Sequence, residues 1–281
     1  MTIAVTAVTG HLGGQIAREL VAQSADHRIV GLARSPGKAS GLDCEVRPGD
    51  YTDRQQLKRS LAGVDKLLLV SGMAAPDERI GQHRNVIEAA IAAGVTKIVY
   101  TSIQGAEEGT AFSPIVQSNR QTEADIRASG LDWAICRNGI YIEPDVEYID
   151  TYKARGEIAN CAGEGKCGYT TRAELAYAYA CMLTDPKHNG QTYNLHGACI
   201  TQTELAEYLN RAFGTKLSYR PMSVADYREE RIGELGEFMG TIIAGIYEGI
   251  RKGALEKPSD FAIATGRQHQ SWDDYFRSIQ A

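Results

Sequence analysis

The strongest constraint on this chain is a glycine-containing turn that joins its first apolar segment to an amphipathic one. Residues 3–14 read IAVTAVTGHLGG, and no acidic residue follows before Glu19. A helix that begins in this way presents free backbone N–H groups, which favour a phosphate. Strand, turn, helix and second strand follow one another in the order of the dinucleotide-binding fingerprint. We therefore predict a phosphate-binding loop that contains Gly10 and Gly13.

Two features of this turn leave the prediction open. Ala7 stands where such turns usually begin with glycine, so the spacing is AxxGxxG. Gly10 and Gly13 would also suit a tight strand-to-helix connection that binds no ligand. The effect of Ala7 depends on its backbone angle, because a positive φ would strain alanine by about 1 kcal/mol whereas a negative φ would suit it.

Short apolar runs alternate with amphipathic stretches through the first half of the chain, which is the pattern of a parallel sheet covered by helices. Residues 67–70, LLLV, predict a central strand that is buried on both faces. We predict an α/β fold of the Rossmann type, a doubly wound parallel sheet with a small mixed α/β C-terminal lobe. Residues 1–150 are expected to form the nucleotide-binding domain, joined by a helix and a strand from about 170–197. Residues 151–281 are expected to form the smaller, substrate-binding lobe.

Composition and charge exclude several classes of partner. The formal net charge is -5 and the basic residues are scattered, so no basic stripe could bind a nucleic acid. No apolar run approaches the length of a membrane span, and we expect a cytoplasmic protein that binds no membrane. The six cysteines form no CxxC pair and the six histidines no HxxxH pair, so we predict no metal site. A homodimer stays open, because the sequence does not reveal the oligomeric state.

The residues after the second predicted strand bear on the choice between NAD and NADP. An acidic residue there would bind the ribose 2′-hydroxyl, whereas a basic residue would accommodate a 2′-phosphate. Arg34 and Lys38 follow the strand with no acidic residue between them, which favours NADP, although both would also suit a solvated loop. Asp50 and Tyr51, after the third strand, are candidates for contact with adenine, although Asp50 could equally cap a turn.

Segments spread along nearly the whole chain resemble one known family. The order and spacing of these segments are similar to those of the NmrA-like branch of the atypical short-chain dehydrogenases, and within it to bacterial NADPH:quinone oxidoreductases and triphenylmethane reductases. The segments are TAVTGHLGG, which parallels TGATGxLG in the family, and ARSPGKA, GDYTD, DKLLLVSG, QHRNVIEAAIAAGV, YTS, RNGIYIE, TTRAELA and YNLHG.

The resemblance implies a Rossmann domain that holds NADPH, a small C-terminal lobe and a substrate cleft between them. It also implies a place for individual residues around the cofactor. These are Thr9, Gly10, His11, Leu12 and Gly13 in the phosphate loop, Arg34 and Lys38 at the 2′-phosphate, Ser71 and Gly72 after the fourth strand, Thr101 and Ser102 at the end of the fifth, and Asn138, Gly139, Ile140 and Tyr141 beside the nicotinamide and the substrate.

One departure from ordinary short-chain dehydrogenases concerns the catalytic acid. Those enzymes use a Tyr-x-x-x-Lys pair, and none of the fourteen tyrosines here is followed by lysine four residues later. The corresponding segment, SNRQTEADI, offers Asn119, Arg120 and Glu123 instead. Reduction of a ketone makes a strongly basic alkoxide that needs a positioned proton donor, whereas reduction of a quinone makes a weakly basic phenolate. The sequence therefore argues against simple ketones and is compatible with conjugated acceptors.

Two functions remain possible at this point. In the first, the protein transfers hydride from NADPH to a quinone or a similar acceptor, with Tyr141 stacking on the acceptor or offering its hydroxyl and Ser102 polarising the acceptor oxygen. Tyr141 could instead be an ordinary half-buried aromatic residue, and Ser102 a strand-end hydroxyl bonded to backbone. In the second, the protein is a catalytically inactive NADP(H)-binding redox sensor, as the resemblance also allows.

Overall fold

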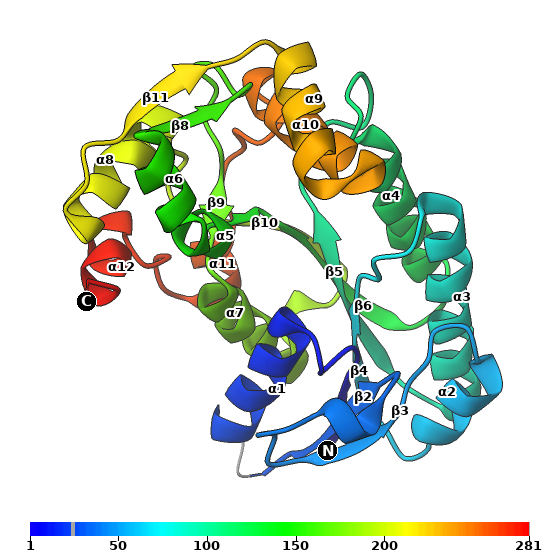
Figure 1. Ribbon diagram of the computed structural model, residues 1–281. Helices are drawn as coiled ribbons and strands as arrows, with labels where there is room; N and C mark the ends of the chain where they lie inside the picture. The colour runs from blue at the N-terminus through cyan, green and yellow to red at the C-terminus, as the bar shows by residue number, and fades with distance from the viewer. Residues whose placement is uncertain (24–25, 281) are drawn as a thin grey trace.

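A seven-stranded sheet, in which every pairing is parallel, forms the centre of the protein (Figure 1). The computed structural model describes residues 1–23 and 26–280. The strand order is β10-β6-β5-β4-β1-β2-β3. Its strands are β1 (Thr2–Val5), β2 (Arg28–Ala33), β3 (Glu45–Pro48), β4 (Lys66–Val70), β5 (Lys97–Ile103), β6 (Asp132–Asn138) and β10 (Gln191–Leu195). The predicted doubly wound Rossmann-type fold is confirmed, and the strand order reverses between β1 and β4, where such sheets bind ligands at their carboxyl edge.

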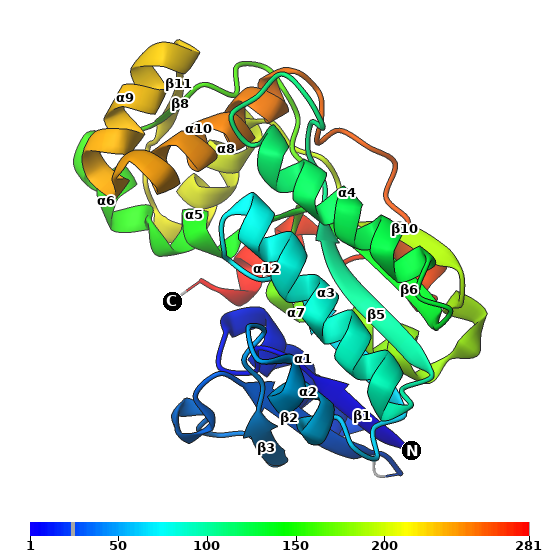
Figure 2. The same ribbon diagram turned by 90° about the vertical axis from the view of Figure 1, so that its right-hand side faces the viewer.

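Helices cover both faces of this sheet (Figures 1 and 2). The first face carries α1 (His11–Gln23), α7 (Arg172–Thr184) and α11 (Phe261–Thr265). The second face carries α2 (Arg54–Ser60), α3 (Pro76–Ala93) and α4 (Ser113–Arg127). In β4, Leu68 packs into the core of the first face while Leu67 and Leu69 pack into the core of the second. The LLLV run is therefore the two-sided central strand that the sequence predicts.

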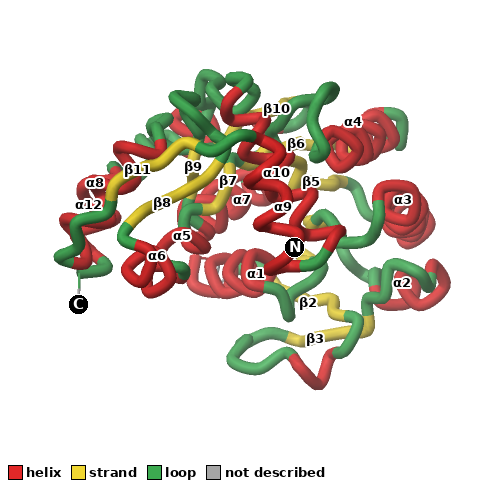
Figure 3. The backbone as a smooth tube through the Cα atoms, turned by 45° about the horizontal axis from the view of Figure 1, so that its top comes forward, coloured by secondary structure: helices red, strands yellow, loops and turns green. Residues whose placement is uncertain are grey.

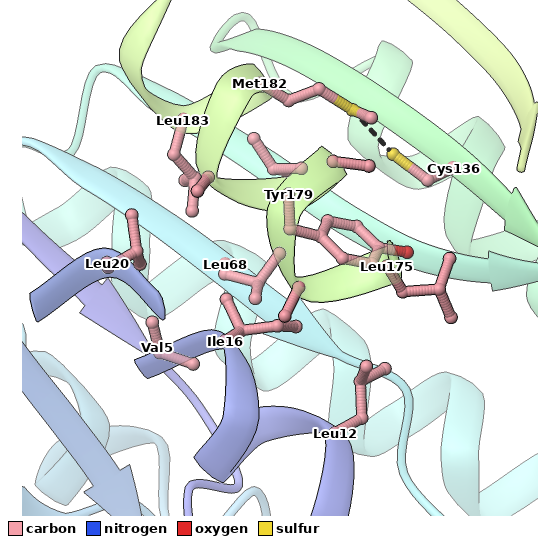
Figure 4. Close-up of a cluster of buried hydrophobic side chains, with 14 of the residues drawn as sticks. Val5, Leu12, Ile16, Leu20, Leu68, Cys136, Leu175, Tyr179, Met182 and Leu183 are labelled. Carbon is pink, nitrogen blue, oxygen red and sulfur yellow. Dashed lines mark hydrogen bonds between the residues drawn. The ribbon is translucent and has the colours of Figure 1, made fainter. Parts of the chain in front are cut away.

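Helices α1 and α7 pack side by side and begin at the same edge of the sheet. Figure 4 shows Leu12 and Ile16 of α1 facing Leu175 and Tyr179 of α7 in one buried cluster. The opposite end of α7 lies at the amino edge, because the ammonium group of Lys66, at the start of β4, donates to the carbonyl of Leu183 at 2.7 Å. Both helix N-termini therefore lie at the carboxyl edge.

The small lobe begins directly at the carboxyl edge, because β7 follows β6 after Gly139 alone (Figure 3). It has two short parallel sheets, β7 with β9 and β8 with β11. Strand β10 then returns to the main sheet beside β6. The elements of the lobe are β7 (Ile140–Tyr141), α5 (Glu143–Glu147), α6 (Ile149–Arg155), β8 (Glu157–Asn160), β9 (Tyr169–Thr170), α8 (Gln202–Phe213), β11 (Ser218–Pro221), α9 (Val224–Leu235), α10 (Glu237–Arg251) and α12 (Trp272–Ser278).

Asp145 places a carboxyl group in the core of this lobe. Asp145 is 5% exposed, and the hydroxyl of Tyr152 donates to its Oδ1 at 2.8 Å. Burial raises the pKa of Asp145 to about 6, although hydrogen bonds from Tyr152, Tyr169 and Tyr247 oppose the shift. The folded state therefore binds this proton more tightly than the unfolded chain does.

The Asp145 carboxyl should make the lobe more stable in mild acid than at alkaline pH. Stability from a raised acid pKa is fully present below the unfolded pKa of about 3.8 and is lost as the pH rises through about 6. Between pH 5 and pH 8 this group should remove about 1.4 kcal/mol from the free energy of unfolding. Urea unfolding should therefore show that the free energy of unfolding of Asp145→Asn, relative to that of the native protein, is higher at pH 8 than at pH 5.

A matched control for this experiment is Asp150→Asn, since the Asp150 side chain is 90% exposed. The control should change the free energy of unfolding by the same small amount at both values of pH. Equal effects of Asp145→Asn at pH 5 and pH 8 would show that the buried carboxyl does not titrate between them.

Candidate functional site

The predicted phosphate loop lies at the carboxyl end of β1 with a strained residue at its start. Ala7 has φ 52°, and among the described residues it is the one non-glycine residue with positive φ. Its carbonyl accepts a hydrogen bond from the Gly10 N–H at 2.9 Å, which closes the turn. The open question about Ala7 is thereby answered, because alanine in this region is strained by about 1 kcal/mol.

The glycines of the loop allow a very close approach of α1 to β1. A Cβ atom on Gly13 would lie 2.5 Å from the Ala7 carbonyl oxygen and 2.8 Å from that of Thr6. One on Gly10 would lie 3.3 Å from the same Ala7 oxygen. Only a residue without a side chain fits at Gly13, which is the role that the dinucleotide fingerprint gives to this position.

The open end of the loop has the properties of an anion site. Thr9, Gly10 and His11 are exposed, whereas the Leu12 side chain turns into the core below α7. The first turn of α1 contains no acidic residue, and the first N–H groups of a helix have no partner within it. This cradle fits a phosphate group.

Glycine at position 7 should relieve the strain in this loop. Ala7→Gly is expected to raise the free energy of unfolding by about 1 kcal/mol, because glycine reaches positive φ without a clash. Thermal unfolding measures this effect, and a titration with NADPH measures whether the strain also limits affinity. A fall in stability would show that Ala7 is not strained, and a large gain in affinity would show that the native loop is compromised.

Arg34 and Lys38 lie exposed in the turn after β2, as expected for a 2′-phosphate site. Neither forms an ion pair with another residue of the described chain. Arg34 is close enough to Asp50 for its charge to act on that carboxyl group. Hydrogen bonds from the N–H and hydroxyl of Thr52 lower the pKa of Asp50, and the Arg34 charge adds to this effect.

Asp50 and Tyr51 both have structural partners. The Asp50 carboxylate accepts the Thr52 N–H at 2.9 Å, which is the turn-capping role that the sequence left open. The Tyr51 hydroxyl lies 2.5 Å from the Thr6 hydroxyl and 2.8 Å from the Val70 carbonyl oxygen. Tyr51 thus joins the ends of β1 and β4, so its hydroxyl is already bonded and only its ring is left for the predicted contact with adenine.

The loop after β4 is held by side chains from neighbouring elements. The Ser71 N–H donates to Thr101 Oγ1 at 2.8 Å, and the Gly72 N–H donates to His83 Nε2 at 2.9 Å. Because Nε2 accepts, the proton of His83 resides on Nδ1, which donates to Thr122 Oγ1 at 2.9 Å. Burial lowers the pKa of His83 to about 3, so this histidine is neutral. Sequence reasoning gave His83 no role at the site.

The hydroxyl of Ser102, predicted to polarise the acceptor oxygen, already has a partner within the protein. This hydroxyl donates to Glu123 Oε1 at 2.7 Å, and both side chains are buried behind β5. Burial would raise the pKa of Glu123, but hydrogen bonds from Arg137 and Ser102 outweigh it and lower the pKa. Arg120 and Arg127 also pair with this carboxylate. Glu123 is thus the centre of an ionic cluster that ties α4 to β6.

Asn119, in the segment where a short-chain dehydrogenase would be expected to have its catalytic pair, is also buried and hydrogen-bonded within the protein. It is 2% exposed, and its Oδ1 accepts the Tyr100 hydroxyl at 2.6 Å. Its amide donates to the Ile115 carbonyl at 2.8 Å. Neither Asn119 nor Glu123 can therefore donate a proton to a ligand.

The segment after β6 brings its predicted residues together at the carboxyl edge. Gly139 is pressed against the lobe, because a Cβ atom there would lie 2.1 Å from the Gly168 carbonyl oxygen. Asn138 is buried and accepts the Tyr179 hydroxyl at 2.7 Å, and Ile140 is half-buried against the core of the lobe. This segment therefore fixes the border between the sheet and the lobe.

Tyr141 is half-buried beside a cation that sequence reasoning missed. The guanidinium of Arg172 lies 5.6 Å from the centre of the Tyr141 ring and 3.3 Å from Glu147. Burial raises the pKa of Tyr141 to about 12, although a hydrogen bond with Asn138 and the Arg172 charge oppose the shift. The Tyr141 hydroxyl is therefore neutral at physiological pH.

Residues 1–23 and 26–280 contain neither a metal-binding cluster nor a membrane-spanning helix. Nowhere in these ranges do three or more His, Cys, Asp or Glu side chains gather closely enough to hold a metal ion. None of the helices in them is both long and apolar enough to cross a membrane.

Known proteins are similar to this chain in sequence. The family described as NAD(P)H-binding matches residues 8–186. Quinone oxidoreductase 2 of Escherichia coli (strain K12) is 35% identical over 259 residues, which cover 90% of this chain and 89% of that protein. An NmrA-like family domain-containing oxidoreductase of Aspergillus flavus is 28% identical over 91% of this chain and 87% of its own.

Solved structures agree with these sequence matches. Citrobacter sp. triphenylmethane reductase complexed with NADP(H) has a TM-score of 0.90 at 34% identity, and 99% of each chain is covered. The NADPH-dependent quinone oxidoreductase QOR2 of Escherichia coli, complexed with NADPH, has a TM-score of 0.90 at 31% identity, again over 99% of each chain. As its motifs predict, the chain belongs to the NAD(P)H-binding family, among relatives that include NmrA-like reductases.

Proposed function

We propose that the protein transfers a hydride from NADPH to a quinone or a similar conjugated acceptor. One observation carries the proposal: the chain combines a dinucleotide cradle with buried, hydrogen-bonded side chains in the segment where the usual proton-donating pair would be expected. The cradle is the loop at Gly10 and Gly13, and the side chains of that segment are Asn119 and Glu123. Such a site can bind the reductant but lacks the tyrosine and lysine that usually protonate a strongly basic alkoxide.

The residues of the main sheet would hold the cofactor. The open N-terminus of α1 would bind the pyrophosphate, and Arg34 with Lys38 would bind the 2′-phosphate, which an NAD molecule lacks. The backbone of Ser71 and Gly72 would lie along the cofactor after β4, supported by Thr101 and by His83. We assign residues 1–150, with the helix and strand from about 170–197, to this role, and residues 151–281 to the acceptor.

The acceptor would lie beside the segment from Asn138 to Tyr141. NADPH, when bound there, supplies the hydride. A quinone that accepts it becomes a phenolate, which is weakly basic and can take its proton from water. Arg172 is a cation beside Tyr141 and would favour this negative charge. The chain's contribution is then to place two flat molecules face to face and to exclude water from between them.

The names of the relatives support an acceptor of this class. One is a quinone oxidoreductase, one is a triphenylmethane reductase, and an NAD(P)H azoreductase of Xenophilus azovorans is 27% identical over 82% of this chain. The acceptors in these names are conjugated molecules that take up hydride without forming an alkoxide.

The proposal is tested by following NADPH absorbance with purified protein and three acceptors. Benzoquinone and a cationic triphenylmethane dye should oxidise NADPH, whereas cyclohexanone should not. Reduction of cyclohexanone at a rate similar to that of benzoquinone would show that a proton donor exists after all. Tight binding of NADPH without oxidation by any acceptor would identify a redox sensor instead of an enzyme.

A further inference from the structure

Arg79 is a buried cation without a counter-ion. It lies in the first turn of α3 and is 4% exposed. Its Nη2 donates to the Ala74 carbonyl at 3.1 Å, while its Nε is buried and has no hydrogen-bond partner. In the part of the chain that the structure describes, no carboxylate pairs with it. By contrast, Arg84, farther along the same helix, is exposed and pairs with Asp125 at 2.8 Å.

Burial of this guanidinium destabilises the folded state, because removing a charge from water costs several kcal/mol unless a partner compensates for the lost hydration. The titratable neighbours of Arg79 supply no negative charge. His83 is neutral and Tyr100 keeps its phenolic proton, since burial lowers the pKa of His83 and raises that of Tyr100 to about 12. The guanidinium therefore has capacity for an anion that the chain itself does not provide.

The position of Arg79 is at the carboxyl edge of the sheet. His83 follows it by one helical turn on the same side of α3 and binds the Gly72 N–H, so Arg79 lies one turn nearer the edge. Figure 2 shows α3 beginning at the edge that faces the small lobe. The loop that accepts a hydrogen bond from Arg79 follows β4, and β4 pairs with β1, which precedes the predicted phosphate loop.

Arg79 contacts the loop that precedes α3. This loop runs from Met73 to Ala75, its side chains are small apart from Met73, and Met73 is 77% exposed. Arg79 bonds to the backbone of this same loop through Ala74. A small displacement of the loop would therefore exchange one hydrogen bond to a neutral carbonyl for stronger bonds to a charged oxygen.

We propose that Arg79 binds an anionic oxygen of a ligand that enters beside the loop after β4. The proposal rests on the proposed function, in which two molecules carry such an oxygen at this edge: NADPH through its phosphates, and the reduced acceptor through its phenolate. The chemistry is the same in both cases, a guanidinium bonded to a charged oxygen in a site shielded from water.

The proposal predicts opposite effects on folding and on binding. In Arg79→Met a side chain of similar length removes the uncompensated charge, so the melting temperature of the ligand-free protein should stay the same or rise. The same variant should lose at least about tenfold in NADPH affinity if the cofactor supplies the oxygen. If the acceptor supplies it, NADPH affinity should stay unchanged while kcat/KM for benzoquinone falls by a similar factor.

The experiment uses the full chain, with calorimetry for the melting temperature, fluorescence titration for NADPH, and steady-state rates with benzoquinone at saturating NADPH. The control Arg84→Met should leave NADPH affinity and acceptor kinetics unchanged. Unchanged affinity and unchanged acceptor kinetics in Arg79→Met overturn the proposal, whatever the melting temperature. If the variant is both less stable and weaker in binding, Arg79→Lys decides: restored binding supports the anion site, and continued loss overturns it.

The proposed function and this inference can fail separately. If the native protein oxidises no NADPH with any acceptor but Arg79→Met still weakens NADPH binding, the proposed reaction is wrong and the proposed anion site is supported. If acceptors are reduced and Arg79→Met matches the native protein in both measurements, the reaction stands and the anion site is wrong.

Discussion

Arg34→Ala is expected to weaken NADPH binding by about 100-fold while changing NADH binding by about threefold or less. The two cofactors differ only in the 2′-phosphate, so a residue that binds this group distinguishes them. Arg34 is exposed, lies in the turn after β2, and has no ion pair within the described chain to satisfy it otherwise. Titration of each reduced cofactor by fluorescence measures the two dissociation constants.

The matched control is Arg28→Ala. Arg28 lies at the opposite end of the same strand and is exposed, but pairs with Glu45 at 2.7 Å. It should leave both affinities unchanged. Lys38→Ala should act in the same direction as Arg34→Ala but less strongly, because an ammonium group lacks the two-pronged geometry of a guanidinium. Equal losses for NADPH and NADH in Arg34→Ala would show that Arg34 does not bind the 2′-phosphate.

Gly13→Ala is expected to abolish measurable NADPH binding and to lower the free energy of unfolding by about 2 kcal/mol. The new methyl group would lie 2.5 Å from the Ala7 oxygen and 2.8 Å from the Thr6 oxygen, and neither backbone atom can rotate away. Helix α1 must therefore move outward from β1. Its open N-terminus would move with it, away from the place where we propose that it binds the pyrophosphate of a cofactor whose 2′-phosphate is bound by Arg34.

Gly37→Ala serves as the control for this substitution. Gly37 lies in the turn beside Lys38, and a Cβ atom there would meet nothing within 4 Å. It should leave both stability and NADPH affinity nearly unchanged. Native affinity in Gly13→Ala would mean that α1 can shift without loss of the binding site, and that the close approach at Gly13 serves packing alone.

The sheet could be predicted from the sequence because each of its signals is local. A strand such as LLLV and a turn such as that at Gly10 and Gly13 are readable within a dozen residues, and the order of the strands follows from the fingerprint at the first of them. The positions of Gly10, Arg34 and Lys38 at one edge followed from the same rule.

The contacts of the site could not be predicted, because they depend on which face of a strand each side chain takes. Thr101 and Ser102 are adjacent, yet Thr101 supports the loop after β4 while Ser102 points behind the sheet to Glu123. A change of one position in the register exchanges the two roles. The contact between Arg172 and Tyr141 could not be predicted either. It depends on the pairing of β7 with β9, whose paired residues are 29 apart in sequence.

The parallel packing of α1 and α7 places two helix dipoles side by side with their positive ends at the same edge, yet the chain treats those ends differently. In α7 the first N–H groups already have acceptors: Glu143 takes that of Arg172 at 2.6 Å, and Thr171 takes that of Glu174 at 3.0 Å. In α1 no side chain of the described residues does the same. The positive end of α7 is thus compensated by acceptors within the protein, whereas the positive end of α1 remains available to an anionic ligand.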